Sequence, residues 1–279
     1  MSDSRELVVT RAGLLLASLT ATMLAAQPAL AQEDEVTEII VTVRQRAESI
    51  QDVPGSVTAF SAAQIEAAGI QRAEDFIAMT PGVSLVQAAE VADSQVNIRG
   101  INGARDGETN YALIIDGILM TNPAALNREY TNLQQIEVLK GPQGALYGRN
   151  AAAGAFIITT EKPGDEWGGN LKASMAEDDT YTLSGLVGGP VNDTLGVSVS
   201  GNFRDSDGYY NNAYVAATNP FGSTDVGDNF KSWDLALRAV WEPSDAMTVD
   251  GKLRVGDVEA GSITFNSASH IPSLVGFLE

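Results

Sequence analysis

A regular alternation of apolar and polar residues runs through residues 166–279 and constrains the fold more than any other feature. The clearest example has apolar residues at Trp233, Leu235, Leu237, Ala239 and Trp241. Successive side chains of a β-strand point to opposite faces, so this period predicts strands with one apolar face. Short turns alternate with longer polar connections, which is typical of outer-membrane barrels.

The spacing of two tryptophans helps to distinguish two kinds of sheet. Trp233 and Trp241 lie eight residues apart, which corresponds to about 26 Å along an extended strand. In a strand tilted by about 40°, both indoles would lie at the edges of an apolar band roughly 25 Å tall. This favours membrane-spanning strands, and a soluble antiparallel sandwich with one buried face is the alternative.

The first 31 residues have the three parts of a secretory signal peptide. Arg5 and Arg11 precede an apolar stretch at residues 12–26, and Ala29-Leu30-Ala31 supplies small residues for cleavage. The apolar stretch is shorter than the roughly 20 residues of a membrane helix. We therefore expect export and cleavage between Ala31 and Gln32, with a buried core helix as the alternative.

The composition excludes several classes of function. The chain has no cysteine, one histidine, and 36 acidic against 17 basic residues, which gives a formal charge of −19. A nucleic-acid-binding protein needs a basic face, and thiolate or clustered-imidazole sites need cysteines or several histidines. We therefore expect no nucleic-acid partner, no metal and no cofactor.

No catalytic constellation is visible either. The glycine-rich run Gly141–Gly148 lacks the Gly-Lys-Ser/Thr end of a phosphate-binding loop. In Asp205–Gly208 the glycine comes too early for an EF-hand. His270 has neither a serine elbow nor a metal partner nearby. We predict that the chain is not an enzyme.

The part before the alternating strands has a different pattern. Residues 32–52 form an acidic leader with a β-prone run, and residues 53–165 mix short helices with strands. One helix is predicted at Ala62–Ala68, ended by Gly69. We predict an α+β domain at residues 53–165 and antiparallel strands from residue 166 onward.

An ordered set of motifs in residues 38–163 closely resembles the plug domain of TonB-dependent outer-membrane receptors. The motifs are Glu38-Ile39-Ile40-Val41-Thr42-Val43, Val53-Pro54-Gly55-Ser56-Val57, Asn97-Ile98-Arg99-Gly100, Tyr111 to Gly117, Ile136 to Pro142 and Leu146 to Gly154. The remainder is similar to the opening of the receptors' barrel, although Lys140 stands where the family usually has glutamate. The resemblance implies an α+β plug followed by antiparallel transmembrane β-barrel strands. It places the protein in a Gram-negative outer membrane, with the plug and N-terminus toward the periplasm.

The resemblance also implies site residues. Glu38, Ile39, Ile40, Val41, Thr42 and Val43 would form the TonB box, a segment able to add to a sheet edge of TonB. Plug and barrel would be held together electrostatically by Arg99, Arg149 and Glu137, since similar receptors pair plug arginines with barrel glutamates. An outward loop able to contact the ligand would contain Tyr209, Tyr210, Tyr214, Phe221 and Phe230. The alternatives are an ordinary first strand, solvated arginines, and interfacial or loop-packing aromatics.

Such a receptor would be a monomer in outer-membrane lipid that actively imports a ferric siderophore, cobalamin or glycan. Transport would be energised when TonB, with its inner-membrane complex, pulls the box. A passive porin or adhesin is the main alternative, and a secreted soluble binding protein or enzyme is the third. Only five or six barrel strands are visible, and an open strand edge cannot stand unpaired in lipid. We therefore expect the 279 residues to be the N-terminal fragment of a larger receptor.

Overall fold

The computed structural model describes residues 39–43, 46–86, 94–104, 107–208 and 229–261. These residues all belong to one compact unit, Ile39–Glu279. The predicted cleavage site at Ala31 and Gln32 lies outside the described residues, as does Glu38. Within the described ranges, no helix combines the length and the apolar character needed to cross a membrane.

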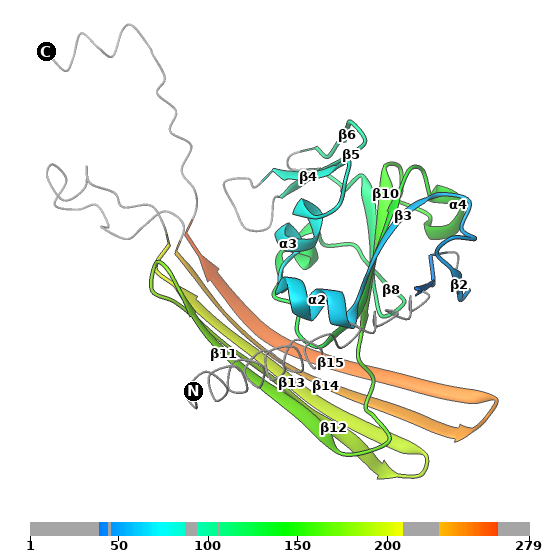
Figure 1. Cartoon of the computed structure of the whole chain (residues 1–279), viewed down its shortest axis with the longest axis vertical. Helices are drawn as coiled ribbons and strands as arrows, with labels where there is room; N and C mark the ends of the chain where they lie inside the picture. The colour runs from blue at the N-terminus through cyan, green and yellow to red at the C-terminus, as the bar shows by residue number, and fades with distance from the viewer. Residues whose placement is uncertain (1–38, 44–45, 87–93, 105–106, 209–228, 262–279) are drawn as a thin grey trace, which may run out of the picture. The chain divides into compact units, whose positions relative to one another are not determined.

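The α+β domain is built on a five-stranded sheet in the order β3-β9-β10-β7-β8 (Figure 1). Its strands are β3 (Ser56–Ser61), β7 (Tyr111–Ile115), β8 (Ile118–Met120), β9 (Leu133–Lys140) and β10 (Gly154–Thr160). The central strand β10 pairs with β7 in parallel and with β9 antiparallel. All five residues of β7 are buried, as its unbroken apolar sequence requires.

Short helices complete this domain. Those in the described residues are α2 (Ala62–Ala68), α3 (Ala73–Ala78), α4 (Gly144–Tyr147) and the 3-10 helix η1 (Pro123–Asn127). Ser61 and Gln64 form a reciprocal capping box at the start of α2. Gly69 ends the helix with a φ of +66°, so the helix and its glycine cap predicted from the sequence are confirmed.

The sheet separates two apolar clusters because alternate residues of each strand face opposite sides. Phe76 of α3, Ile136 of β9 and Phe156 of β10 belong to the first cluster, in which the two phenyl rings meet edge to face with centroids 5.7 Å apart. On the other face, Leu139 packs in a second cluster with Val41 from the N-terminal segment. Strand β9 therefore contributes to both clusters.

Two smaller sheets flank this core. One pairs β4 (Val83–Val86), β5 (Gln95–Ile98) and β6 (Ile101–Asn102), all antiparallel. The other pairs β1 (Ile40–Val41) with β2 (Glu48–Ser49). The β-prone run expected from the sequence is therefore a short strand in the structure.

The alternating region forms an antiparallel sheet, here called the wall sheet, in which neighbours in sequence are neighbours in space (Figure 1). Its strands are β11 (Gly168–Ala176), β12 (Thr180–Asn192), β13 (Leu195–Ser206), β14 (Phe230–Ser244) and β15 (Met247–Ala260). In β14, Trp233, Leu237 and Trp241 are nearly half exposed, whereas Ser232 and Arg238 are buried. The predicted alternation is confirmed, with the apolar face outward and a polar face inward.

Candidate functional site

The segment Ile39–Val43 is docked on the α+β domain. Val41 and Val43 are fully buried in the second apolar cluster. The backbone pairs with β2 along one edge. The segment is therefore fixed by apolar burial and by backbone pairing together.

Two side chains of β9 occupy the other edge of this segment. Gln135 Nε2 donates a hydrogen bond to the Ile40 carbonyl oxygen at 2.7 Å. Both carboxylate oxygens of Glu137 accept from the Thr42 backbone N–H at 2.9 Å, and one also accepts from the Thr42 hydroxyl at 3.0 Å. In an extended chain the carbonyl of one residue and the N–H two residues later lie on the same edge. Gln135 and Glu137 thus supply the donor and the acceptor that a neighbouring strand would supply.

Tyr147 of α4 closes the end of the docked segment. Its hydroxyl donates to the Val43 carbonyl oxygen at 2.6 Å. Burial, and to a smaller extent the Glu137 carboxylate, raises the pKa of Tyr147 to about 12. The hydroxyl therefore stays protonated and remains a donor at neutral pH.

Glu137 is one of the most buried charged residues of the domain, with a relative exposure of 1%. Burial raises the pKa of Glu137, while the hydrogen bonds donated by Thr42 and by the Val43 backbone oppose that effect. The sequence assigned Glu137 to the plug–barrel contact, but the structure places its carboxylate under the docked segment. The reason is that Glu137 points to the face of β9 that carries the second apolar cluster.

The two arginines predicted to hold the domain in a barrel lie elsewhere on its surface. Arg149 pairs with Glu108 of the same domain, and both side chains are more than half exposed. Arg99 is exposed and has a φ of +52° in the turn between β5 and β6. Contacts from Arg99 or Arg149 to barrel strands stay predictions. An exposed ion pair such as Arg149–Glu108 contributes only about 0–1 kcal/mol.

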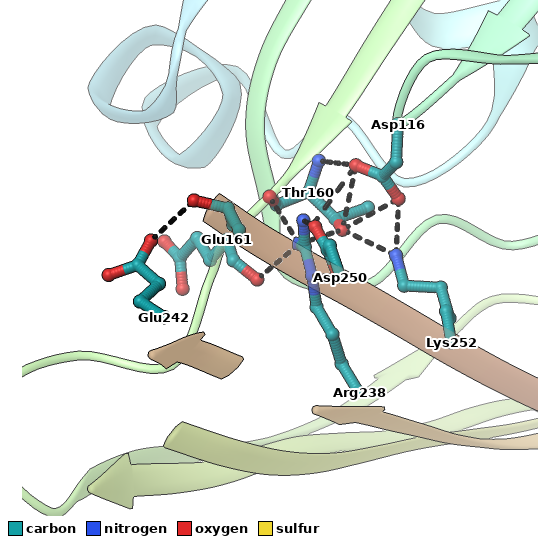
Figure 2. A network of polar contacts seen from close by, with 8 residues as sticks. Asp116, Thr160, Glu161, Arg238, Glu242, Asp250 and Lys252 are labelled. Carbon is teal, nitrogen blue, oxygen red and sulfur yellow. Dashed lines mark hydrogen bonds and ion pairs between the residues drawn. The ribbon is translucent and has the colours of Figure 1, made fainter. Parts of the chain in front are cut away.

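Other residues join the α+β domain to the wall sheet. Figure 2 shows Asp116, from the β7–β8 turn, and Thr160, at the end of β10, facing Arg238 of β14 and Lys252 of β15. Arg238 Nη1 donates to the Thr160 carbonyl at 2.9 Å and to the Thr160 hydroxyl at 3.0 Å. Lys252 Nζ donates to the Asp116 carboxylate and, at 2.7 Å, to the Thr160 hydroxyl. We call this group the Arg238 attachment.

Arg238 makes further hydrogen bonds on both sides of this contact. Its Nε and Nη2 atoms donate to the Asp250 carboxylate at 3.0 and 2.6 Å, and Nη1 also donates to the Glu161 carbonyl at 2.9 Å. The side chain is only 4% exposed. A planar guanidinium can satisfy several acceptors at fixed angles, so arginine suits a buried contact of this kind.

The described ion pairs between the α+β domain and the wall sheet all have their charges arranged in the same way. The resemblance implied plug arginines opposite barrel glutamates, whereas in the described residues the domain supplies carboxylates and the wall sheet supplies bases. The ion pairs across the contact are Lys172–Glu66 at 3.0 Å, Arg204–Glu129 at 3.5 Å, Arg238–Asp116 at 4.0 Å and Lys252–Asp116. No sequence motif indicated Asp116, Glu129 or Thr160 as contact residues.

Glu129, which follows η1, is the most buried carboxylate in this contact, with its side chain 3% exposed. Burial raises the pKa of Glu129 to about 7, although the neighbouring Arg204 and Arg72 oppose the shift. The folded state therefore binds a proton here more tightly than the unfolded state does. The resulting stabilisation is complete below the ordinary pKa near 4.5 and is lost as the pH rises through about 7.

The raised pKa of Glu129 predicts how the stability of the protein depends on pH. We expect the free energy of unfolding to fall between pH 4.5 and pH 7 by at most about 3 kcal/mol on account of Glu129. Glu129→Gln should remove that slope, as measured by urea midpoints across the pH range in detergent. Glu66→Gln, which alters an exposed carboxylate of the same contact, should keep the slope. An unchanged slope in Glu129→Gln would contradict the assignment.

Neither a metal site nor the proposed ligand loop is visible in the described part of the chain. No group of three or more His, Cys, Asp or Glu residues there is arranged to hold a metal ion. The loop residues Tyr209, Tyr210, Tyr214 and Phe221 fall outside the described residues. Phe230 is described and is the first residue of β14, so its prediction as a residue of the outward loop is wrong.

Comparison with known proteins identifies this arrangement. Residues 49–155 match the family model described as the TonB-dependent Receptor Plug Domain. The iron-regulated outer membrane virulence protein of Vibrio cholerae is 28% identical over 211 residues, covering 68% of this chain and 31% of that protein. The vitamin B12 transporter BtuB of Photobacterium profundum is 23% identical over 276 residues, covering 92% of this chain and 43% of the transporter.

A solved structure shows the same fold. The ferric yersiniabactin uptake receptor FyuA from Yersinia pestis superposes with a TM-score of 0.65 at 23% identity, covering 72% of this chain and 31% of the receptor. The chain thus spans less than half the length of each of these relatives. The outer-membrane location expected from the sequence agrees with the name of the Vibrio cholerae relative. Residues 49–155 therefore belong to the plug-domain family of TonB-dependent receptors, and the wall sheet that follows has the fold of the strands of those receptors.

Proposed function

We propose that this chain serves the active import of a scarce ligand across the outer membrane, driven when TonB pulls the docked segment Ile39–Val43. The observation that carries the proposal is the docked segment itself. One edge of its backbone is covered by two side chains, Gln135 and Glu137, rather than by a strand. A partner strand could replace both side chains and pair with the same backbone groups.

The energetics suit an exchange of this kind. Replacing the hydrogen bonds to Gln135 and Glu137 by those of a partner strand is nearly neutral, since each bond contributes only about 0.5–1.5 kcal/mol net. The main cost is the exposure of Val41 and Val43, at about 1.5–3 kcal/mol for each side chain. The segment is therefore held at rest but can be released by a partner that offers a strand and mechanical work.

The chemistry of the ligand is proposed as that of a ferric siderophore, cobalamin or a glycan. The names of the relatives support the first two, because one is iron-regulated, one transports vitamin B12 and one takes up ferric yersiniabactin. The other proposed partners are TonB with its inner-membrane complex and the outer-membrane lipid that would cover the apolar face of the wall sheet. We propose a monomer without catalytic activity. A passive porin or adhesin is the second candidate, but it would have no use for a docked segment.

Collapse of the proton-motive force tests this function. We expect uptake in cells expressing the complete gene to fall to the background of cells lacking it when a protonophore is added, while surface binding persists. Labelled ferric siderophores, cobalamin and maltodextrins would be compared side by side. Uptake that continues unchanged after the collapse would exclude active import and favour the porin.

A further inference from the structure

A second contact joins the plug to the wall sheet at the end of β13 and the beginning of β14. It contains Arg72, the N-cap residue of α3, and Glu129 on the plug side. Arg204 of β13 and Phe230 of β14 lie on the wall side. We call these four residues the Phe230 junction.

The two arginines come from different parts of the fold but share two neighbours, and Arg72 also pairs with Glu74 of α3. Their guanidinium carbons lie 5.8 Å (Arg72) and 5.9 Å (Arg204) from the centroid of the Phe230 ring, which is within the range of a cation–π contact. Both also face one carboxylate oxygen of Glu129, at 3.9 Å from Arg72 and 3.5 Å from Arg204. A displacement of Phe230 or Arg204 therefore alters the surroundings of Arg72 directly.

The junction is held more loosely than the Arg238 attachment. In the described structure, neither Glu129 Oε1 nor Arg204 Nε has a hydrogen-bond partner, although both atoms are buried. Arg238, in contrast, makes hydrogen bonds of 2.6–3.0 Å to the plug and to Asp250. Glu129 also lines two cavities, of about 350 and 380 Å³. At the Arg238 attachment the side chain is tightly hydrogen-bonded. At the junction, Arg254 of β15 donates to the Glu129 carbonyl at 3.2 Å, but the side chains of the four junction residues meet across the contact only through charge and ring contacts.

The plug side of the junction is connected to the docked segment through packed residues. Asp75 of α3 accepts hydrogen bonds from the backbone N–H groups of Gln71 and Arg72, which ties Arg72 to the start of the helix. On the same helix, Phe76 packs in the first apolar cluster with Ile136 of β9. The neighbouring residue of β9 is Glu137, which holds Thr42.

We propose that the Phe230 junction couples the β13–β14 end of the wall sheet to the plug and so sets how firmly the segment Ile39–Val43 is docked. Arg72 is a positioning residue in this proposal, since it acts through α3 and β9. The proposal rests on the proposed function in one respect, because active import is what gives the release of the segment a purpose. Contiguous packing does not by itself demonstrate energetic coupling, so the experiment measures the coupling.

A thiol at a buried position of the segment provides the measurement. Val43 is fully buried, so Val43→Cys would react with a maleimide only when the segment leaves its site. None of the 279 residues is a cysteine, and labelling of the protein that retains Val43 gives the background of the complete gene product. The labelling rate would be measured in outer membranes from cells expressing the complete gene. We expect Phe230→Leu and Arg72→Gln each to raise the rate by about fivefold or more. The double variant should react no faster than the faster single variant, because both changes break the same connection.

Matched controls separate coupling from general damage. Phe230→Tyr keeps an aromatic ring, and Lys231→Gln changes an exposed neighbour on the same strand, so both should label at the parent rate. Should Phe230→Leu fail to assemble, Arg204→Gln takes its place in the same comparison. Unchanged labelling in the single variants, effects that multiply in the double variant, or equal acceleration by Lys231→Gln would each overturn the proposal. Labelling requires neither ligand nor TonB, so a failure of active import would leave this result intact.

Discussion

Replacement of Ile40 by proline is expected to abolish energy-dependent uptake while ligand binding stays at the level of the parent protein. Proline lacks a backbone N–H, and its ring fixes φ. The segment could therefore no longer present a complete hydrogen-bonding edge to a partner strand. The Ile40 side chain is 45% exposed, so little packing is lost. Binding and uptake of the same labelled ligand, measured in energised cells, would show the two effects separately.

Ile40→Val is the matched control, because it keeps the backbone N–H and the β-branched shape. It should transport like the parent protein. Normal uptake by Ile40→Pro would show that the segment is not the contact with TonB. Loss of binding together with uptake would instead point to a plug that no longer folds.

Replacement of Arg238 by methionine is expected to have the largest effect on the folded protein, a loss of about 1–3 kcal/mol in the free energy of unfolding. The guanidinium group satisfies the Asp250 carboxylate and the backbone carbonyls of Thr160 and Glu161. Methionine fills a similar volume but donates no hydrogen bond, so the carbonyl of the buried Thr160 would lose its donor and the Asp250 carboxylate, whose side chain is 32% exposed, would lose its partner. Urea midpoints and the resistance of the plug to protease would both register the change.

Two comparisons make this result specific. Lys231→Met, which removes one partner of an exposed ion pair with Asp205, should change stability by no more than about 0.5 kcal/mol. The double variant Arg238→Met/Asp250→Leu should recover part of the loss, since it removes the stranded carboxylate as well. A urea midpoint for Arg238→Met equal to that of Lys231→Met would contradict the role of the attachment.

The wall sheet could be predicted from the sequence because the alternation that identifies each strand lies within a few consecutive residues. In an extended chain, a period of two fixes which side chains share a face. The outward positions of Trp233 and Trp241 followed from the alternation, as did the inward position of Arg238. What the pattern could not supply was the partner of Arg238, because Thr160 lies 78 residues away in the chain.

The contacts of the docked segment could not be predicted from the sequence either. Its β-prone sequence predicted a strand, but Thr42 and Glu137 are separated by 95 residues, and no local pattern relates them. A usable signal was present in β9, where Glu137 stands among Ile136, Val138 and Leu139. A carboxylate in such a buried strand requires donors from elsewhere. The sequence therefore indicated an unmet hydrogen-bonding need without revealing which residue meets it.

The arrangement of charge in the plug–wall contact also bears on the register of the strands. Lys172, Arg204, Arg238 and Lys252 of the wall sheet all pair with carboxylates of the plug. Since burying an unpaired charge is strongly unfavourable, strands that pack against the plug in this register leave each base with a partner, whereas a shifted register would leave bases unpaired. In this way, part of the information that sets the register of the strands would be carried by the domain that they contact.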